Sequence, residues 1–339
     1  MKKKLLGLTI DELKDVAKEV GLPAFAAKQI ADWLYVKRAK AIEDMTNLSK
    51  TGRETLASLY EVGYTFPSQT TTSEDGTIKY LFEFDNGLIE TVFIPEKDRA
   101  TLCVSCQVGC KMDCLFCMTG KQGFTRNLTV NEIINQVYAI PEFDKLTNIV
   151  YMGMGEPFDN TLAVLKSLNV LTEPWGRAFS PRRITVSTVG VVPGLKQFLE
   201  RSESHLAISL HNAFAEERLQ MIPTEKAYPI EKTIPILKKY DFSHQRRVSF
   251  EYILFDQKND SLRHAMQVVK LLNGLHCRVN LIYFHPIPDI PLKSPDEKTF
   301  VTFRDYLTNH GVMATIRRSR GVDILAACGL LSSTNKKEA

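Results

Sequence analysis

The amino-acid sequence predicts an α/β fold whose main domain holds a parallel β-sheet. After residue 99, short apolar runs alternate with stretches whose apolar residues recur at helical spacing. Such strand–helix repeats are typical of parallel sheets, because parallel neighbours need a crossover connection. Residues 1–62 have helical patterns, and residues 63–98 shift toward alternation. The repeats fit either a barrel-like sheet or an open doubly wound one.

The N-terminal region is predicted to be a helical domain. Thr9 and Glu12 have the spacing of a capping box, so a helix is expected to begin there. Pro23 can open a second helix that continues through residues 28–38. Residues 51–60 have the pattern of another helix.

A β-hairpin is predicted between the helical domain and the main domain. Residues 80–84 and 88–94 both alternate apolar and polar side chains, and they flank Asp85-Asn86-Gly87. That tripeptide is a strong turn signal. We expect this linker region to be a short β extension.

The main domain is assigned to residues 99–331. Its expected strands are residues 101–105, 147–152, 183–188, 205–210, 248–254 and 278–284, with a last one at 312–316. Its expected helices are one capped by Thr129 and Glu132, then residues 161–172, 230–239, 261–273 and 297–310. The polar residues 332–339 are predicted to be a disordered tail.

Composition narrows the class of protein. The 339 residues are 44% hydrophobic and 24% charged, which suits a globular protein with a large core. The net charge of +4 is small, so any contact with a polyanion must depend on local basic patches. The first residues are too poorly apolar for a signal peptide, and no run of 18 apolar residues occurs. We therefore expect a cytoplasmic protein without membrane contact. A monomer is the expected oligomeric state.

Seven cysteines indicate metal or redox chemistry, since no secretory context favours disulfides. Cys110, Cys114 and Cys117 have a C-x3-C-x2-C spacing. Thiolates are the ligands that iron–sulfur clusters require. Three of them leave one iron of a 4Fe-4S cluster open to the amino and carboxylate groups of a methionine moiety. Electron transfer into the sulfonium then releases a carbon radical.

A structural zinc site is the alternative. Cys103-x2-Cys106 and Cys114-x2-Cys117 could supply four zinc ligands. The separation of the two pairs is shorter than in most zinc ribbons, and the first pair falls within a predicted strand. These two points favour the cluster.

Polar residues follow the apolar part of successive strands. Gly155-Glu156 ends the second strand, Ser187 lies at the end of the third, and Ser209 and His211 end the fourth. Ligands of α/β sheets bind beyond the carboxyl ends of strands. A glycine lets the backbone approach a ligand, and a carboxylate can pair with an ammonium group. Singly, each residue is more often a cap or a turn.

In these motifs the sequence resembles the RlmN/Cfr family of radical S-adenosylmethionine adenine methyltransferases of RNA. The resemblance covers nearly the whole chain and is carried by residues 102–110, 110–117, 152–157, 180–188, 208–211 and 323–329. It implies a partial (β/α)6 barrel of the radical-SAM type with an N-terminal domain that docks RNA. It also implies one 4Fe-4S cluster on Cys110, Cys114 and Cys117, and two S-adenosylmethionine molecules per turnover.

The resemblance also implies roles for Cys328, Cys103 and Glu90. One S-adenosylmethionine methylates Cys328, and a second yields a deoxyadenosyl radical that removes hydrogen from that methyl group. The carbon radical adds to adenine, and Cys103 resolves the protein–RNA thioether, leaving a Cys103–Cys328 disulfide. Glu90 accepts a proton. From the residues alone, both cysteines could be buried apolar positions and Glu90 an exposed strand position.

Further cofactor contacts follow from the family pattern. They are Gly155 and Glu156 for the methionine amino end, and Ser187, Ser209, Leu210, His211 and His285 for the rest of S-adenosylmethionine. Four positions depart from the pattern: His285 replaces Asn, Leu325 replaces Asp, Leu330 replaces Gln, and Cys106 replaces Ser and is expected not to be a ligand.

Residues 155–157 are nearer the branch that methylates carbon 2 of adenine in 23S rRNA and tRNA than the branch that methylates carbon 8. The target base must be unstacked to reach a buried pocket. A reductase such as flavodoxin is the expected electron donor. Carbon-8 methylation, a radical enzyme for a small molecule or protein, and a non-catalytic zinc or cluster RNA-binding protein remain alternatives.

Basic pairs are candidates for phosphate contacts, although such pairs are also common on solvated surfaces. They are Lys37, Arg38 and Lys40; Lys121 and Arg126; Arg182 and Arg183; Arg246 and Arg247; and Arg317, Arg318 and Arg320.

Overall fold

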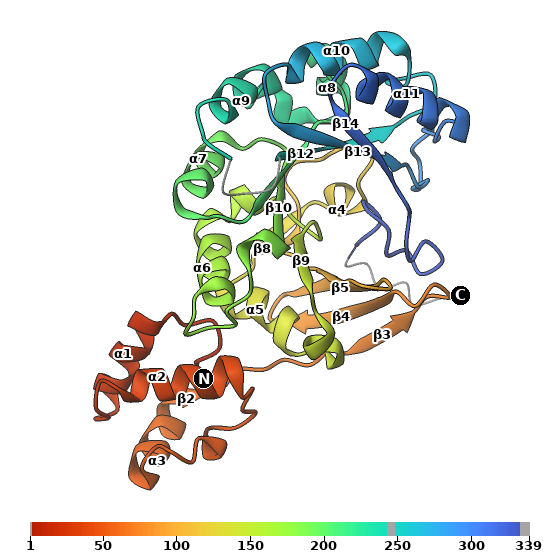
Figure 1. Ribbon diagram of the computed structural model, residues 1–339. Helices are drawn as coiled ribbons and strands as arrows, with labels where there is room; N and C mark the ends of the chain where they lie inside the picture. The colour runs from red at the N-terminus through yellow and green to blue at the C-terminus, as the bar shows by residue number, and fades with distance from the viewer. Residues whose placement is uncertain (1, 243–247, 333–339) are drawn as a thin grey trace.

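The computed structural model describes residues 2–242 and 248–332 (Figure 1). Its largest sheet has ten strands in the order β14-β13-β12-β11-β10-β9-β6-β5-β4-β3. The N-terminal helices lie at one end of the molecule, and the chain leaves them to enter this sheet (Figure 1). Arg246 and Arg247, two predicted phosphate contacts, lie outside the described residues.

The parallel part of the sheet confirms the predicted α/β fold. Adjacent strands from β6 to β14 in this order pair in parallel. They are β6 (Ala100–Cys103), β9 (Asn148–Tyr151), β10 (Ile184–Thr188), β11 (His205–Ser209), β12 (Val248–Leu254), β13 (Cys277–Tyr283) and β14 (Met313–Arg317). The first six match the six predicted strands, and β14 matches the expected last one.

Helices connect these strands; α6, α7, α9 and α10 lie on the outer side of the sheet, whereas α4 lies on its inner side (Figure 1). They are α4 (Met118–Lys121), α5 (Val130–Tyr138), α6 (Thr161–Thr172), α7 (Val192–Arg201), α8 (Ala215–Met221), α9 (Ile230–Leu237), α10 (Leu262–Leu272) and α11 (Glu297–Asn309). The capping box of Thr129 and Glu132 opens α5 as predicted. Helices α4, α7 and α8 were not among the expected helices.

Three antiparallel strands extend the other edge of the sheet. They are β3 (Gln69–Thr72), β4 (Ile78–Phe84) and β5 (Gly87–Pro95). The predicted hairpin is confirmed, and its turn is tight because Asn86 takes a left-handed φ of 56°. Strand β5 pairs antiparallel with β6, with Val92 opposite Cys103. The extension is therefore hydrogen-bonded to the strand that leads into the cysteine loop.

The N-terminal residues form a helical unit that packs on α5 and α6. Its elements are β1 (Lys3–Lys4), α1 (Ile10–Glu19), α2 (Ala26–Ala31), the π-helical turn Asp32–Val36, α3 (Lys50–Leu59) and β2 (Tyr60–Glu61). The capping box of Thr9 and Glu12 opens α1 as predicted. The Asn131 amide of α5 donates to the carbonyls of Leu6 and Gly63, at 3.0 and 3.1 Å.

A separate pair of short strands, β7 (Gln107–Gly109) and β8 (Phe124–Asn127), brackets the cysteine loop. Among the described residues, no helix is long and apolar enough to cross a membrane. Ser332, which the sequence assigned to a disordered tail, instead donates its backbone N–H to Glu90 at 2.9 Å. Residues 333–339 lie outside the described part of the chain.

Candidate active site

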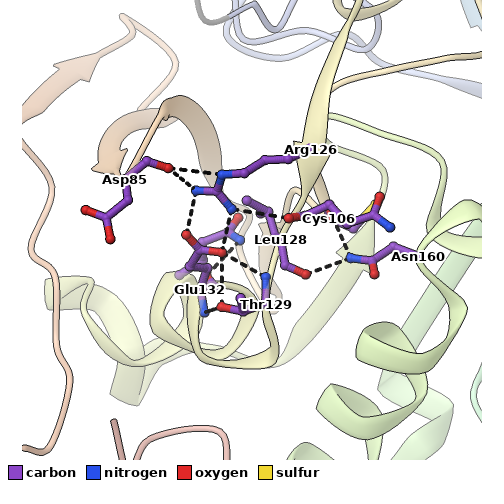
Figure 2. A network of polar contacts seen from close by, with 9 residues as sticks. Asp85, Cys106, Arg126, Leu128, Thr129, Glu132 and Asn160 are labelled. Carbon is purple, nitrogen blue, oxygen red and sulfur yellow. Dashed lines mark hydrogen bonds and ion pairs between the residues drawn. The ribbon is translucent and has the colours of Figure 1, made fainter. Parts of the chain in front are cut away.

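The segment that leads into the cysteine loop is held by buried hydrogen bonds (Figure 2). The Asn160 amide donates to the carbonyls of Cys106 and Leu128, at 2.9 and 2.8 Å. The Leu128 N–H also donates to the Cys106 carbonyl, at 3.1 Å. These bonds fix the two ends of the β7–β8 pair against the start of α6.

Arg126 closes the same network from the other side (Figure 2). Its guanidinium binds the Glu132 carboxylate through two bonds of 2.7 and 2.9 Å and donates twice to the Asp85 carbonyl. A guanidinium bound in this bidentate way is strongly oriented. Arg126 was predicted to contact phosphate, but it joins the hairpin turn, β8 and α5 within the protein.

Cys110, Cys114 and Cys117 line one cavity at the carboxyl ends of the strands. Their loop turns at Asp113, whose φ is 46°, and the Met112 N–H points at the Cys110 sulfur at 3.5 Å. Burial raises the pKa of the Cys110 thiol to about 12 and that of Cys114 well above its usual value. Thiols in such a site become ligands when a metal displaces their protons.

The donor set fits a cluster better than a single zinc ion. The alternative zinc site would need Cys103 and Cys106 beside Cys114 and Cys117. Cys106 lines neither cavity described here, and its thiol points at the Met154 carbonyl at 3.6 Å. A cluster spreads its thiolates over several irons, so three cysteines around one cavity suit it.

Glu156 is one of two buried acids that line this cavity, the other being Glu251. Its carboxylate accepts from the Thr188 hydroxyl at 2.6 Å and from the backbone N–H groups of Phe158 and Val189, each at 3.0 Å. Burial nevertheless raises the pKa of Glu156 to about 7. A positively charged ligand in the cavity would favour the ionised form.

Gly155, Ser187 and Ser209 also line the cavity, as predicted. Gly155 has a φ of +98°, and a Cβ there would lie 2.5 Å from the Cβ of Gln107. A side chain at position 155 would therefore be strained by the backbone and by packing on β7. Backbone strain and packing on β7 therefore each favour glycine at position 155. The close approach of a ligand, which the sequence indicated, is a third reason.

His211 lines the cavity as a neutral imidazole. Burial, together with the nearby charge of Arg218, lowers its pKa to about 3. Its Nδ1 accepts from the Ile253 N–H at 3.0 Å, so Nε2 carries the proton. Leu210, also predicted to contact the cofactor, is fully buried and lines neither cavity described here. Its N–H donates to the Glu251 carbonyl at 2.9 Å.

A second, larger cavity adjoins the first, with about 520 Å³ against about 140 Å³. It occupies the inner face of the sheet, and Glu251 and Cys328 line both cavities. Six arginines face it: Arg99, Arg182, Arg278, Arg317, Arg318 and Arg320. The second cavity therefore has the charge that suits an anionic ligand.

His285 lies on the second cavity and does not line the first. Its Nε2 is 2.8 Å from the Ser319 hydroxyl, and burial lowers its pKa. The predicted contact of His285 with the cofactor is therefore not supported by its place on the cavity wall.

The three predicted catalytic residues lie at different depths. Cys328 is exposed to the cavities, and Cys103 lines the second one. Glu90 lines neither cavity, because Lys79 holds its carboxylate at 2.8 Å and Ser332 bonds to its other oxygen. Both cysteines are free thiols.

Glu251 was missed by the sequence analysis. Its carboxylate accepts from Asn280 at 2.8 Å and pairs with Arg317 at 3.3 Å, beside Cys328. An acid in an otherwise apolar strand, after Ser249-Phe250, was the available signal. Charges in a buried strand are rare unless they are paired or functional.

Comparisons with known proteins define the class first. Residues 104–269 match the radical SAM superfamily, and residues 3–62 match the ribosomal RNA large subunit methyltransferase N-terminal domain. The crystal structure of a radical SAM methyltransferase from Sphaerobacter thermophilus superposes with a TM-score of 0.91 at 42% identity, covering 98% of this chain and 100% of that one. The fold is therefore that of a radical SAM methyltransferase, which implies a 4Fe-4S cluster and S-adenosylmethionine.

Close relatives then give the family. The probable dual-specificity RNA methyltransferase RlmN of Parabacteroides distasonis is 58% identical over 98% of this chain and 97% of its own length. The dual-specificity RNA methyltransferase RlmN of Sulfurimonas denitrificans is 41% identical over 100% of this chain and 99% of its own. The chain belongs to the RlmN family.

Proposed function

We propose that the chain methylates carbon 2 of a specific adenosine in 23S rRNA and in tRNA. One observation carries the proposal: Cys328 stands where two cavities meet. The first cavity holds the three cluster cysteines and the polar strand ends. The second holds Cys103 and six arginines. Cys328 can thus face a cofactor on one side and an anionic polymer on the other.

Residues of the first cavity bind and orient the cofactor. When bound on Cys110, Cys114 and Cys117, the cluster supplies the electron that cleaves S-adenosylmethionine. Two buried carboxylates line this cavity, and Glu251 is already paired with Arg317, so Glu156 is the one that pairs with the methionine ammonium. Polar contacts to the remaining parts come from Ser187, Ser209 and His211, while Gly155 lines the wall through its backbone. Leu210 does not contact the cofactor directly; it helps to position the strand end that does.

Residues of the second cavity carry the methyl group to the base. Cys328 accepts a methyl group from one S-adenosylmethionine and delivers its carbon to adenine after a second one is cleaved, so two are used per turnover. Cys103 resolves the thioether and forms a disulfide with Cys328. Glu90 accepts the proton that leaves the ring. His285 faces the substrate side. An external reductase such as flavodoxin is the electron donor, reduction of the disulfide restores the two thiols, and the enzyme works as a monomer.

The test is an anaerobic assay of the full, cluster-loaded chain with S-adenosylmethionine, a reductant, and either unmodified 23S rRNA fragment or tRNA. Mass spectrometry of the digested RNA is expected to show 2-methyladenosine. Cys328→Ala should abolish it, and Cys103→Ala should accumulate protein–RNA adduct. Cys277→Ala is the matched control, because Cys277 is buried in β13 and lines neither of the two cavities.

Other outcomes separate the alternatives. Methyl groups at carbon 8 would place the chain with the other branch of the resemblance. Cofactor cleavage without RNA methylation would leave a radical enzyme with another substrate. A bound zinc ion and no cluster would contradict the proposal.

A further inference from the structure

A buried ion pair outside both cavities connects the β extension to the C-terminal segment. Lys79 of β4 and Glu90 of β5 bind through Nζ and Oε1 at 2.8 Å, with side chains only 16% and 10% exposed. The other carboxylate oxygen, Oε2, accepts the Ser332 backbone N–H at 2.9 Å. One carboxylate thus holds a lysine of the extension and the segment that follows Cys328.

A second anchor, in helix α4, holds the same segment. The Met118 N–H donates to the Gly329 carbonyl at 2.8 Å, and the Thr119 hydroxyl donates to the Leu331 carbonyl at 2.7 Å. Both donors belong to α4, which begins directly after Cys117. Residues 329–332 therefore lie between the cluster loop and Glu90, and Cys328 lies at their start.

Charge makes Lys79 important for this arrangement. A carboxylate at this depth needs an opposite charge, because an unpaired buried ion is costly. An ionised acceptor also binds an N–H donor more strongly than a neutral one does. We propose that Lys79 is a positioning residue, which keeps Glu90 in place as a latch for Ser332 and so fixes the segment that carries Cys328.

The latch has a consequence for turnover, and this part rests on the proposed function. The carboxylate that accepts the proton is the same one that holds Ser332. RNA that displaces residues 329–332 from Glu90 would uncover the proton acceptor and free Cys328 to move toward Cys103 in one event. Substrate binding and exposure of the acceptor are then coupled through the displacement of this one segment.

The test is amide hydrogen exchange, measured by mass spectrometry on the full, cluster-loaded chain without RNA. In Lys79→Met, the amides of residues 330–332 should exchange at least fivefold faster than in the wild type. Lys79→Arg should restore the wild-type rate. Lys14→Met is the matched control, because the Lys14–Asp11 pair is exposed. The Met118 amide should stay protected, since its bond to Gly329 does not involve Glu90.

A second pair of variants tests the same inference if Lys79→Met does not fold. Ser332→Pro deletes the latch donor, and Ser332→Ala keeps it; only the first should speed exchange at Leu330 and Leu331. Wild-type protection in both Lys79→Met and Ser332→Pro would overturn the inference. The proposed function stands apart from this result, because it is decided by RNA methylation in the wild type.

Discussion

Glu156 shows how one buried residue responds both to the protein and to its ligand. Three donors within 3.0 Å favour the carboxylate, and burial opposes them and prevails, so the pKa rises from 4.5 to about 7. In the cluster-free protein the neutral acid is therefore favoured up to about pH 7. An ammonium group in the cavity would reverse this balance.

A prediction follows for stability. Because the folded-state pKa of Glu156 is raised, the stability it contributes is fully present below about pH 4.5 and is lost as the pH rises through about 7. Between pH 5 and pH 8 the wild type should lose roughly 2–3 kcal/mol of unfolding free energy relative to Glu156→Gln, whose side chain does not titrate. Urea denaturation of the reduced, cluster-free proteins measures this. Equal changes with pH in both would contradict the assigned pKa.

The residues of the site were predictable where a motif carried them. The spacing of Cys110, Cys114 and Cys117 and the polar strand ends at Glu156 and Ser187 were visible in the sequence. Glu251 was not found, because its role depends on Asn280 of the neighbouring strand and on Arg317 of the strand beyond it. Contacts between side chains on different strands depend on the register in which the strands pair. That register cannot be read from the sequence pattern of a single strand.

At the scale of elements, Arg218 of α8 joins the ends of β10 and β11. Its side chain is fully buried, and it donates to the carbonyls of Val189, Ser209 and Leu210 at 2.8–3.0 Å. Glu225 supplies the opposite charge. Burial lowers the pKa of Arg218, and Glu225 opposes this change. The two strand ends that line the first cavity are thus held by one cation.

Removing that cation should be strongly destabilising. Arg218→Met leaves the buried Glu225 carboxylate unpaired and three carbonyls without their donor, so we expect a loss of about 3–5 kcal/mol in unfolding free energy. Combining it with Glu225→Gln should cost clearly less than the sum of the single variants, because the unpaired charge is then absent. Denaturation of all four proteins provides the double-mutant cycle. Strict additivity would show that the pair is not coupled.

Helices were predicted well where their caps are local. The boxes at Thr9 and Thr129 lie where the sequence places them. Helix α7 was missed because it contains Pro193-Gly194, which is a turn signal in sequence. In the structure Pro193 occupies the first turn, where its missing N–H is harmless. Gly194 packs so closely that a Cβ would lie 2.4 Å from Phe158.

At the scale of the whole molecule, the fold places two chemically different cavities on one sheet. The carboxyl ends of the parallel strands build the first, and the inner face of the same strands builds the second. The sequence indicated the strands and the hairpin, but not that β5 pairs with β6 and so brings Glu90 near the C-terminal segment. The resulting hydrogen bond between Glu90 and Ser332 joins residues about 240 positions apart.

The arginines of the second cavity lead to a prediction about RNA. Arg182 and Arg318 are exposed at its wall, where phosphates of an entering strand would lie. Each phosphate contact adds about 0.7 to the slope of log affinity against log salt for single-stranded RNA. Arg182→Ala and Arg318→Ala should each weaken tRNA binding and lower that slope by about this amount, measured by filter binding between 50 and 200 mM salt.

Lys196→Ala is the matched control, since Lys196 is an exposed cation on α7 that does not line the second cavity. Its slope should equal that of the wild type, because a charge away from the bound strand releases no counterion. Unchanged slopes in both arginine variants would move the RNA path away from the second cavity. A lowered slope in those two alone would place the phosphates beside Cys328, where the proposed transfer to the base occurs.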